Sequence, residues 1–211
     1  MAINKTIFTA DRTAQKSEIL AWLQANAADY FDSIETDTDG NIECSLENSA
    51  KILFMFDTSA TIYKVMSKTE KSKYIYSGSA ENAYTKAGIA TSKGLMLIST
   101  ATSATDNIII ISKTNSGTTA ISAFAKTSSG SASLPFHYFI DLNNDTDWLG
   151  TSQNILTYST PATSLAPVCF ASGNYCEHVF TTIFSQFVNS PCIMQINGKK
   201  YAYGGYLALE E

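Results

Sequence analysis

Three apolar stretches that follow one another along the chain decide the fold: Gly94-Leu-Met-Leu-Ile-Ser-Thr100, Asn107-Ile-Ile-Ile-Ile-Ser112 and Thr118-Thr-Ala-Ile-Ser-Ala-Phe124. They are rich in aliphatic residues, and loops of Ser, Thr, Asn and Gly separate them, which is typical of strands in a meander. The four consecutive isoleucines at residues 108–111 lack polar alternation, so they predict a central strand covered on both faces.

Further strands are predicted on both sides of this meander, at residues 42–46, 51–56, 61–67, 73–76 and 136–142, with several short ones after residue 155. The run Lys-Ile-Leu-Phe-Met-Phe at residues 51–56 predicts a buried strand. Asp-Thr-Asp-Gly-Asn at residues 37–41 is a turn signal, and residues 143–153, which include Trp148, predict a polar loop.

One helix is predicted, over residues 13–31. Asp11 or Thr13 is suited to cap its start. Apolar residues recur at helical spacing and predict a core-facing stripe, formed by Ile19, Leu20, Trp22, Leu23, Ala27, Tyr30 and Phe31. The chain therefore predicts an α+β, mostly β fold, in which an N-terminal helix packs on an antiparallel sheet or β-sandwich. We expect a single domain over residues 1–211: an arm at 1–12, the helix, and a β-rich body at 32–211.

Charge is sparse in this chain. Charged residues make up 16% of the sequence, hydrophobic residues 45%, and the net charge is −5. A charge-poor surface loses little hydration energy when it is buried against another protein, which favours assembly. Residues 64–73 hold the densest lysines, but Glu70 interrupts them and they predict a solvated loop or edge. We therefore expect no nucleic-acid binding.

The sequence has no signal-peptide pattern at its start and no apolar run long enough for a membrane span. We expect synthesis in the cytoplasm and no membrane insertion. The cysteines are Cys44, Cys169, Cys176 and Cys192. Free, mostly buried thiols are the default interpretation, with a thiol pair or a late disulfide between Cys169 and Cys176 as the alternative.

Catalytic motifs are missing from the sequence. It contains no Gly-x-Ser-x-Gly elbow and no phosphate-binding glycine loop. His137 lies in an apolar strand pattern, where a buried, hydrogen-bonded side chain is the better interpretation. His178, Cys169 and Cys176 are not spaced as zinc ligands usually are, and a fourth ligand would have to come from elsewhere in the chain. We expect neither an enzyme nor a cofactor.

Two acidic segments are similar to calcium loops. Residues 35–46 match the first half of an EF-hand loop but place Leu46 where a bidentate Glu is required, so a hairpin turn is favoured. The second segment spaces oxygen ligands at every second residue and makes weak calcium candidates of Asp141, Asn143, Asp145 and Asp147. With Trp148 beside it for sugar stacking, this loop carries the alternative function, a calcium-assisted carbohydrate- or cell-surface-binding β-sandwich module.

The C-terminal segment runs Ile193-Met-Gln-Ile-Asn-Gly-Lys-Lys-Tyr-Ala-Tyr-Gly-Gly-Tyr-Leu-Ala-Leu209. Asn197-Gly198 between two strand patterns is typical of a type I′ hairpin. Gly204-Gly205 then allows a bend before a last strand at residues 206–209.

Four pieces of the C-terminal region, residues 165–168, 179–182, 196–201 and 205–209, resemble the ending of uncharacterised virion proteins of tailed bacteriophages and prophages of Gram-positive bacteria. The resemblance implies a non-catalytic head, neck or tail component whose partners are copies of itself and other virion proteins. We expect the C-terminal segment and residues 1–12 to form sheet edges or arms at interfaces. The interface candidates are Tyr201, Tyr203, Tyr206, Leu207 and Leu209.

Overall fold

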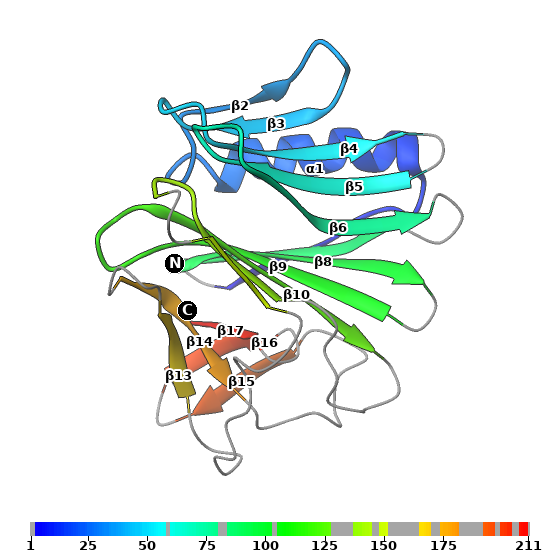
Figure 1. Cartoon of the computed structure of the whole chain (residues 1–211). Coiled ribbons are helices and arrows are strands. Elements are labelled where there is room, and N and C mark those ends of the chain that lie inside the picture. The colour runs from blue at the N-terminus through cyan, green and yellow to red at the C-terminus, as the bar shows by residue number, and fades with distance from the viewer. Residues whose placement is uncertain are drawn as a thin grey trace.

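A computed structural model describes most of the chain. It covers residues 3–57, 60–79, 84–102, 105–127, 137–144, 148–151, 165–169, 174–181, 192–196, 199–203 and 207–210, and within them the side chains of 3–57, 60–77, 84–100, 107–123, 140–144 and 174–176. These residues form one helix and three antiparallel sheets (Figure 1). The predicted mostly β, α+β fold is confirmed.

The seven-stranded sheet is the middle layer of the molecule. Its strands, in spatial order, are β1 (Asn4–Ile7), β7 (Tyr84–Thr91), β8 (Gly94–Thr102), β9 (Thr105–Lys113), β10 (Thr119–Thr127), β11 (His137–Asp141) and β12 (Trp148–Thr151). Every neighbouring pair is antiparallel, and β7 to β12 follow one another in chain order as the predicted meander does.

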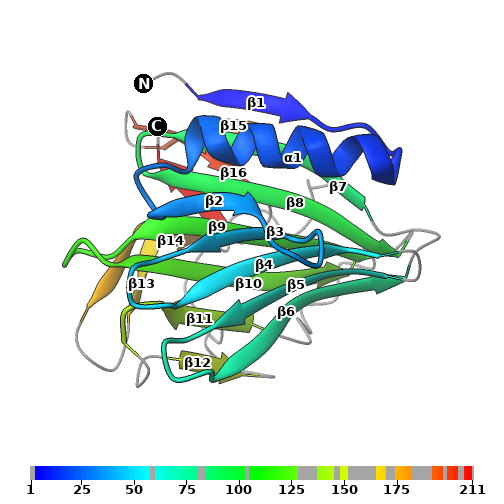
Figure 2. The same cartoon turned by 90° about the horizontal axis from the view of Figure 1, so that it is seen from above.

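A second layer covers one face of this sheet. It consists of helix α1 (Arg12–Asn26) and a five-stranded sheet in chain order, β2 (Ser33–Thr36), β3 (Ile42–Ser45), β4 (Lys51–Phe56), β5 (Ala60–Met66) and β6 (Ser72–Ser79). The view from above shows α1 running beside β2, so that the helix and the strands form one continuous layer (Figure 2). The two layers make a β-sandwich that the helix extends.

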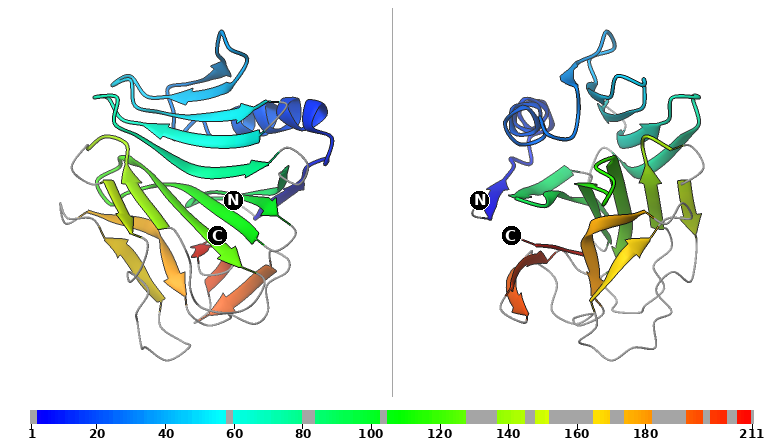
Figure 3. Two further views of the ribbon diagram at one scale, coloured as in Figure 1. Left: turned by 45° about the vertical axis from the view of Figure 1, so that its right-hand side comes forward. Right: turned by 90° about the vertical axis from the view of Figure 1, so that its left-hand side faces the viewer.

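A third sheet covers the opposite face of the middle layer (Figure 3). Its strands, in spatial order, are β13 (Leu165–Cys169), β14 (Tyr175–Thr181), β17 (Leu207–Glu210), β16 (Lys199–Tyr203) and β15 (Cys192–Ile196). Strands β14 and β17 contact β9 and β8 of the middle sheet. The central strands of that sheet therefore lie between two layers.

Strand β9 shows the effect of this arrangement. All four isoleucines at residues 108–111 are at most 2% exposed. Ile109 and Ile111 belong to the core shared with the five-stranded sheet, while Ile108 and Ile110 face the other way and are buried there as well. The prediction of a central strand covered on both faces is confirmed.

Strand β4 differs from its prediction. Within residues 51–56, Ile52 and Phe54 are fully buried, but Leu53 and Met55, on the opposite face, are only half-buried. The strand is apolar on both faces, as the sequence indicates, yet only the inner face is packed inside the described part of the chain. Trp148 also differs, because it begins strand β12 and pairs with Ile140 instead of lying in a loop.

Helix α1 begins as predicted and ends earlier. The Asp11 carboxylate accepts hydrogen bonds from the backbone N–H groups of Thr13 and Ala14 at 2.9 and 3.2 Å, which makes Asp11 the N-cap. The helix stops at Asn26, five residues before the predicted end, because the chain must turn there to enter β2. Tyr30 and Phe31 are nevertheless buried, since their N–H groups bond to Ala27 O and fold the turn onto the core.

The helix packs against the middle sheet at Gly88 of β7. The indole ring of Trp22 lies over this glycine and meets Phe8 edge-on, with 5.9 Å between ring centroids. A Cβ atom at position 88 would lie 2.7 Å from the Trp22 ring. The small residue is therefore required by the packing of α1.

We predict that Gly88→Ala destabilises the fold by about 1–3 kcal/mol, because the rigid indole and the strand must move apart to admit a methyl group. Gly117→Ala is the matched control: that glycine has φ +84° but open space around it. The control carries only the left-handed backbone penalty, about 1–2 kcal/mol. Urea unfolding followed by the fluorescence of the two tryptophans measures both variants, and a Gly88→Ala protein as stable as the wild type contradicts the packing.

Candidate interaction surface

The C-terminal segment contributes one edge strand, β15, to the third sheet, but its last strand does not lie at an edge. Strand β17 lies in the middle of the third sheet and pairs with β14 on one side and β16 on the other. Ile196 of β15 is the partner of Lys199 of β16. This register agrees with the hairpin predicted at Asn197-Gly198. The expected edge is therefore confirmed for β15 and not for β17, because the last strand inserts between earlier ones, a long-range pairing that local pattern does not encode.

The interface candidates Tyr201, Tyr203, Leu207 and Leu209 thus lie on paired strands, while Tyr206 and the side chains of all five lie outside the described residues. Their role in an interface stays a prediction. Removing residues 200–211 would delete β17 from the centre of its sheet, so a truncation there would test folding more than assembly. The N-terminal segment does contain an edge strand, since β1 pairs only with β7 in the described sheet.

Two of the calcium candidates are occupied by hydrogen bonds. Asp141 is 1% exposed, and its carboxylate accepts from Thr118 Oγ1 at 3.1 Å and from Asn143 N at 3.0 Å. Asn143 Oδ1 accepts from Thr119 N at 3.1 Å. These bonds tie the end of β11 to β10. Asp145 and Asp147 lie outside the described residues.

The Asp-Gly segment forms the predicted hairpin turn between β2 and β3. Asp37 accepts bonds from Asn41 and Asp39 N–H groups, and Gly40 has φ +81°. Slight burial acts to raise the pKa of Asp37, but the donors of Asn41 and Asp39 outweigh it and hold the pKa below its ordinary value. Lys16 of α1 donates to Gly40 O, which fastens this turn to the helix.

The described cysteines are buried thiols. Cys44 is a free thiol that is fully buried, and burial raises its pKa, while Cys176 is 1% exposed. The alternative of a thiol pair or a late disulfide between Cys169 and Cys176 stays a prediction. His137 and His178 lie on β11 and β14, and Cys169 and Cys192 on β13 and β15, with side chains outside the described set. No three His, Cys, Asp or Glu side chains that the structure describes gather closely enough to hold a metal ion.

A buried hydroxyl cluster joins the sheets of the sandwich. The hydroxyls of Tyr63, Thr85 and Ser99 bond to one another, with 3.1 Å between Thr85 Oγ1 and Ser99 Oγ. The side-chain amide of Gln15 on α1 binds the backbone of Thr85 twice. Gln15 Nε2 donates to Thr85 O, and Gln15 Oε1 accepts from Thr85 N. All four residues are 0% exposed. Because burial raises the pKa of Tyr63 and no substrate reaches the cluster, we interpret it as a structural network.

A pocket of about 380 Å³ lies between the end of α1 and the β7–β8 turn. Two of its polar side chains form hydrogen bonds with backbone groups. Asn26 Nδ2 donates to Trp22 O at 2.8 Å, and Thr91 Oγ1 accepts from Lys93 N at 3.1 Å. Burial, with a smaller contribution from the Asp29 charge, raises the pKa of Tyr30 to about 12. The Tyr30 hydroxyl is therefore neutral at physiological pH and unsuited to act as a base.

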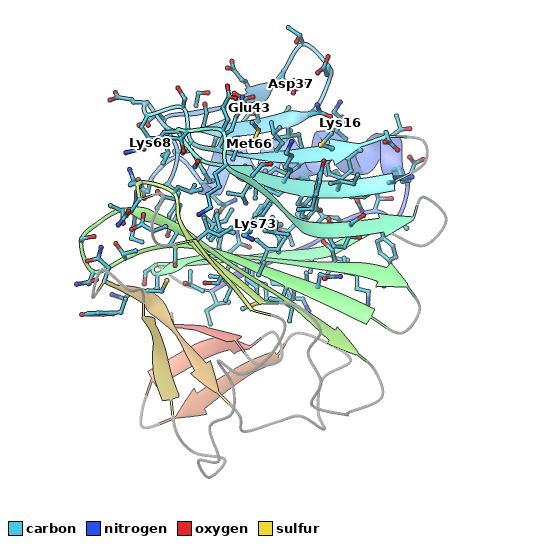
Figure 4. The ribbon with its side chains drawn as sticks, viewed as in Figure 1. Lys16, Asp37, Glu43, Met66, Lys68 and Lys73 are labelled. Carbon is cyan, nitrogen blue, oxygen red and sulfur yellow. The ribbon has the colours of Figure 1, made fainter. Side chains whose placement is uncertain are left out.

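The outward-facing side of the five-stranded sheet, called here the outer face, is the most distinctive surface. Along β3, β4 and β5, buried side chains alternate with half-buried ones, so every second residue points away from the core. Figure 4 shows these side chains, with Glu43 on β3 and Met66 on β5. The apolar members of the outer face are Leu53, Met55, Ile62, Met66 and Tyr74, and Tyr74 is 59% exposed.

One row of directly paired residues crosses the outer face from edge to edge. In strand order it reads Glu35, Glu43, Leu53, Lys64 and Tyr74. Both acids stand on one side of Leu53, and the lysine and tyrosine on the other. We call this set the central row.

Contacts within the chain hold parts of this row in place. Lys51 Nζ lies 2.8 Å from Glu43 Oε2, and Lys64 Nζ lies 5.5 Å from the centre of the Tyr74 ring. Glu35 accepts a 3.4 Å bond from Ser33 Oγ. Glu35 and Glu43 are nevertheless directly opposite each other, and like charges in that position destabilise a strand pair.

Comparisons with protein-family models, with curated proteins and with solved structures find no match to this chain. No helix in the described part of the chain has the length and apolar character to span a membrane.

The hydroxyl cluster predicts unequal effects of two small substitutions. Tyr63→Phe leaves the Thr85–Ser99 bond intact and is expected to lower the free energy of unfolding by about 0.5–1.5 kcal/mol. Thr85→Val leaves the buried Tyr63 hydroxyl with only its 3.4 Å contact to Ser99. This second variant is expected to lower the free energy of unfolding by about 1–3 kcal/mol. Chemical denaturation ranks the two variants. A Thr85→Val protein more stable than Tyr63→Phe would contradict this account of the network.

Proposed function

We propose that this chain is a non-catalytic structural subunit of a phage-like particle, built in the cytoplasm, that acts by assembling with copies of itself and with other virion proteins. The observation that carries the proposal is the outer face. Exposed apolar side chains scattered singly are ordinary on a soluble protein, whereas a contiguous apolar patch marks a contact surface. Here the patch extends over three adjacent strands, β4, β5 and β6.

The pattern of β4 strengthens this support. Its residues from Ile52 to Phe56 are apolar on both faces, as in a strand that is covered twice, and its outer side chains Leu53 and Met55 are incompletely buried in the described chain. A solvent-facing strand of an antiparallel sheet is expected to carry polar residues at these positions. Burial of the outer face against another protein would account for the sequence.

Two further features agree with assembly. Strand β1 forms one edge of the seven-stranded sheet, and its Ile7 is 67% exposed. Such an edge presents free backbone hydrogen-bonding groups to another chain. The low charge of the whole sequence, at 16% of residues, reduces the desolvation cost of covering such surfaces.

The polar groups that the structure describes support a non-catalytic role. The hydroxyl cluster around Tyr63 is closed to solvent, and the oxygens of Asp141 and Asn143 hold a turn together. The neutral Tyr30 in the pocket lacks a general-base role at physiological pH. We therefore assign the function to surfaces and not to a reacting centre.

We predict that the purified full-length chain self-associates and that Ile62→Lys weakens the association at least tenfold. A lysine in the apolar patch removes a buried aliphatic group worth about 1.5–3 kcal/mol and introduces a charge that must be desolvated. Sedimentation velocity over a concentration series measures the effect, and negative-stain electron microscopy shows the form of larger assemblies.

Ser17→Lys on the exposed side of α1 is the matched control, because it adds the same side chain away from the outer face and is expected to associate like the wild type. A wild-type protein that stays monomeric throughout the series, alone and in negative stain, contradicts the proposed function. Equal association by wild type and Ile62→Lys removes the outer face from it.

A further inference from the structure

We infer that the outer face pairs with the same face of a second copy, about a two-fold axis that runs parallel to β4 and passes through Leu53. The inference rests on the proposed function and adds to it the partner, the symmetry and the contacting residues. It is carried by the order of charges in the central row together with the position of β4 as the middle strand of five.

The central row is self-complementary. Counting outward from Leu53, the first neighbours are Glu43 on one side and Lys64 on the other. A two-fold axis along β4 places each strand of one copy over the strand at the same distance on the opposite side of the other copy. Glu43 therefore meets Lys64 of the second copy, and the symmetry repeats the contact, as a two-fold interface requires.

The second neighbours match as well. The outermost members of the row are Glu35 on β2 and Tyr74 on β6. The same axis brings Tyr74 of the second copy towards Glu35, where the phenol can donate a hydrogen bond to the carboxylate. Leu53 meets its own copy at the axis, and the flanking Met55, Ile62 and Met66 form the apolar remainder.

Charge favours this axis over one that runs perpendicular to the strands. An axis in the same plane but perpendicular to the strands would set each strand over its own copy. It would then place Glu43 against Glu43 and Lys64 against Lys64, and like charges brought together at an interface oppose association. Of these two axes, only the one along β4 joins opposite charges, in the contact of Glu43 with Lys64.

The pairing also relieves a conflict inside the chain. Glu35 and Glu43 oppose each other across β2 and β3, and Lys51 is the only ion-pair partner of Glu43 in the described chain. Lys64 from the second copy adds a cation beside this acidic pair. Lys51 lies at the start of β4, near the rim, where its ammonium bends towards Glu43 and can remain hydrated.

The dimensions of the sheet set the strength of the contact. Five strands about 4.8 Å apart and about six residues long give a face of roughly 20 by 20 Å, or about 400 Å² per copy. This is about half of a standard stable interface, so the dimer should be weak, with a dissociation constant of tens of micromolar or more. Such a contact forms fully only at high local concentration or with further contacts beside it.

The test exchanges the charges between two separately purified full-length proteins. Glu43→Lys alone faces Lys64 with a like charge twice, and Lys64→Glu alone faces Glu43 with a like charge twice. Each variant is expected to dimerise at least tenfold more weakly than the wild type. Mixed in equal amounts, the two variants are expected to form a one-to-one dimer at wild-type strength, because both contacts again join opposite charges.

Sedimentation velocity from about 5 to about 300 µM covers the expected range, and native mass spectrometry identifies the mixed dimer by its mass. Glu47→Lys in the exposed β3–β4 turn makes the same charge change outside the central row and is expected to behave as the wild type. Circular dichroism melting curves confirm that each variant is folded before mixing.

The outcomes separate this inference from the function on which it rests. Wild-type association with no recovery on mixing overturns the two-fold pairing through Glu43 and Lys64 and leaves self-assembly standing through another surface. A wild-type protein that is monomeric at 300 µM overturns both.

Discussion

The meander strands β8, β9 and β10 are apolar on both faces, and this requires the middle sheet to be covered twice. Leu95 and Leu97 of β8 face the same side as Ile109 and Ile111 of β9, while Met96, Ile108 and Ile110 face the other. Water on either face would expose several large aliphatic side chains, each worth about 1.5–3 kcal/mol when buried. The helix and the five-stranded sheet therefore occupy one side, and the C-terminal sheet occupies the other.

The local sequence pattern predicts the strands whose large apolar side chains form this core. It misses strands whose residues are small because a neighbouring element packs closely on them. The four isoleucines of β9 are buried on both faces of the strand, as their pattern predicts, and Asp11 caps α1 as its residue type predicts. Strand β7 escaped prediction because it contains Ala87, Gly88 and Ala90, which weaken a strand pattern. The reason lies in the helix, since Trp22 packs on Gly88 and leaves no room for a larger residue.

The sequence pattern also does not predict which segments far apart in the chain pair with each other. Strand β17 enters the middle of its sheet, and β1 joins β7 across more than seventy intervening residues. The central row has the same character, because Glu35, Glu43 and Lys64 look unrelated until the registers of four strand pairs align them. The sequence of β4 nevertheless indicates that both of its faces are covered, because its apolar residues are consecutive. Taken alone, this pattern predicts a strand buried within one chain and does not reveal a contact with a second chain.

Strands β4 and β9 pose the same physical problem and resolve it differently. Both carry apolar side chains at consecutive positions, so both need a second covering layer. For β9 the third sheet supplies it, and the isoleucines fall to 2% exposure or less. For β4 the described chain supplies only the inner layer, and Leu53 stays incompletely buried between an acid and a lysine. In the proposed dimer, a second copy rotated about β4 supplies the missing layer and places Lys64 opposite Glu43. The rule that builds the sandwich inside the subunit thereby extends to the contact between subunits.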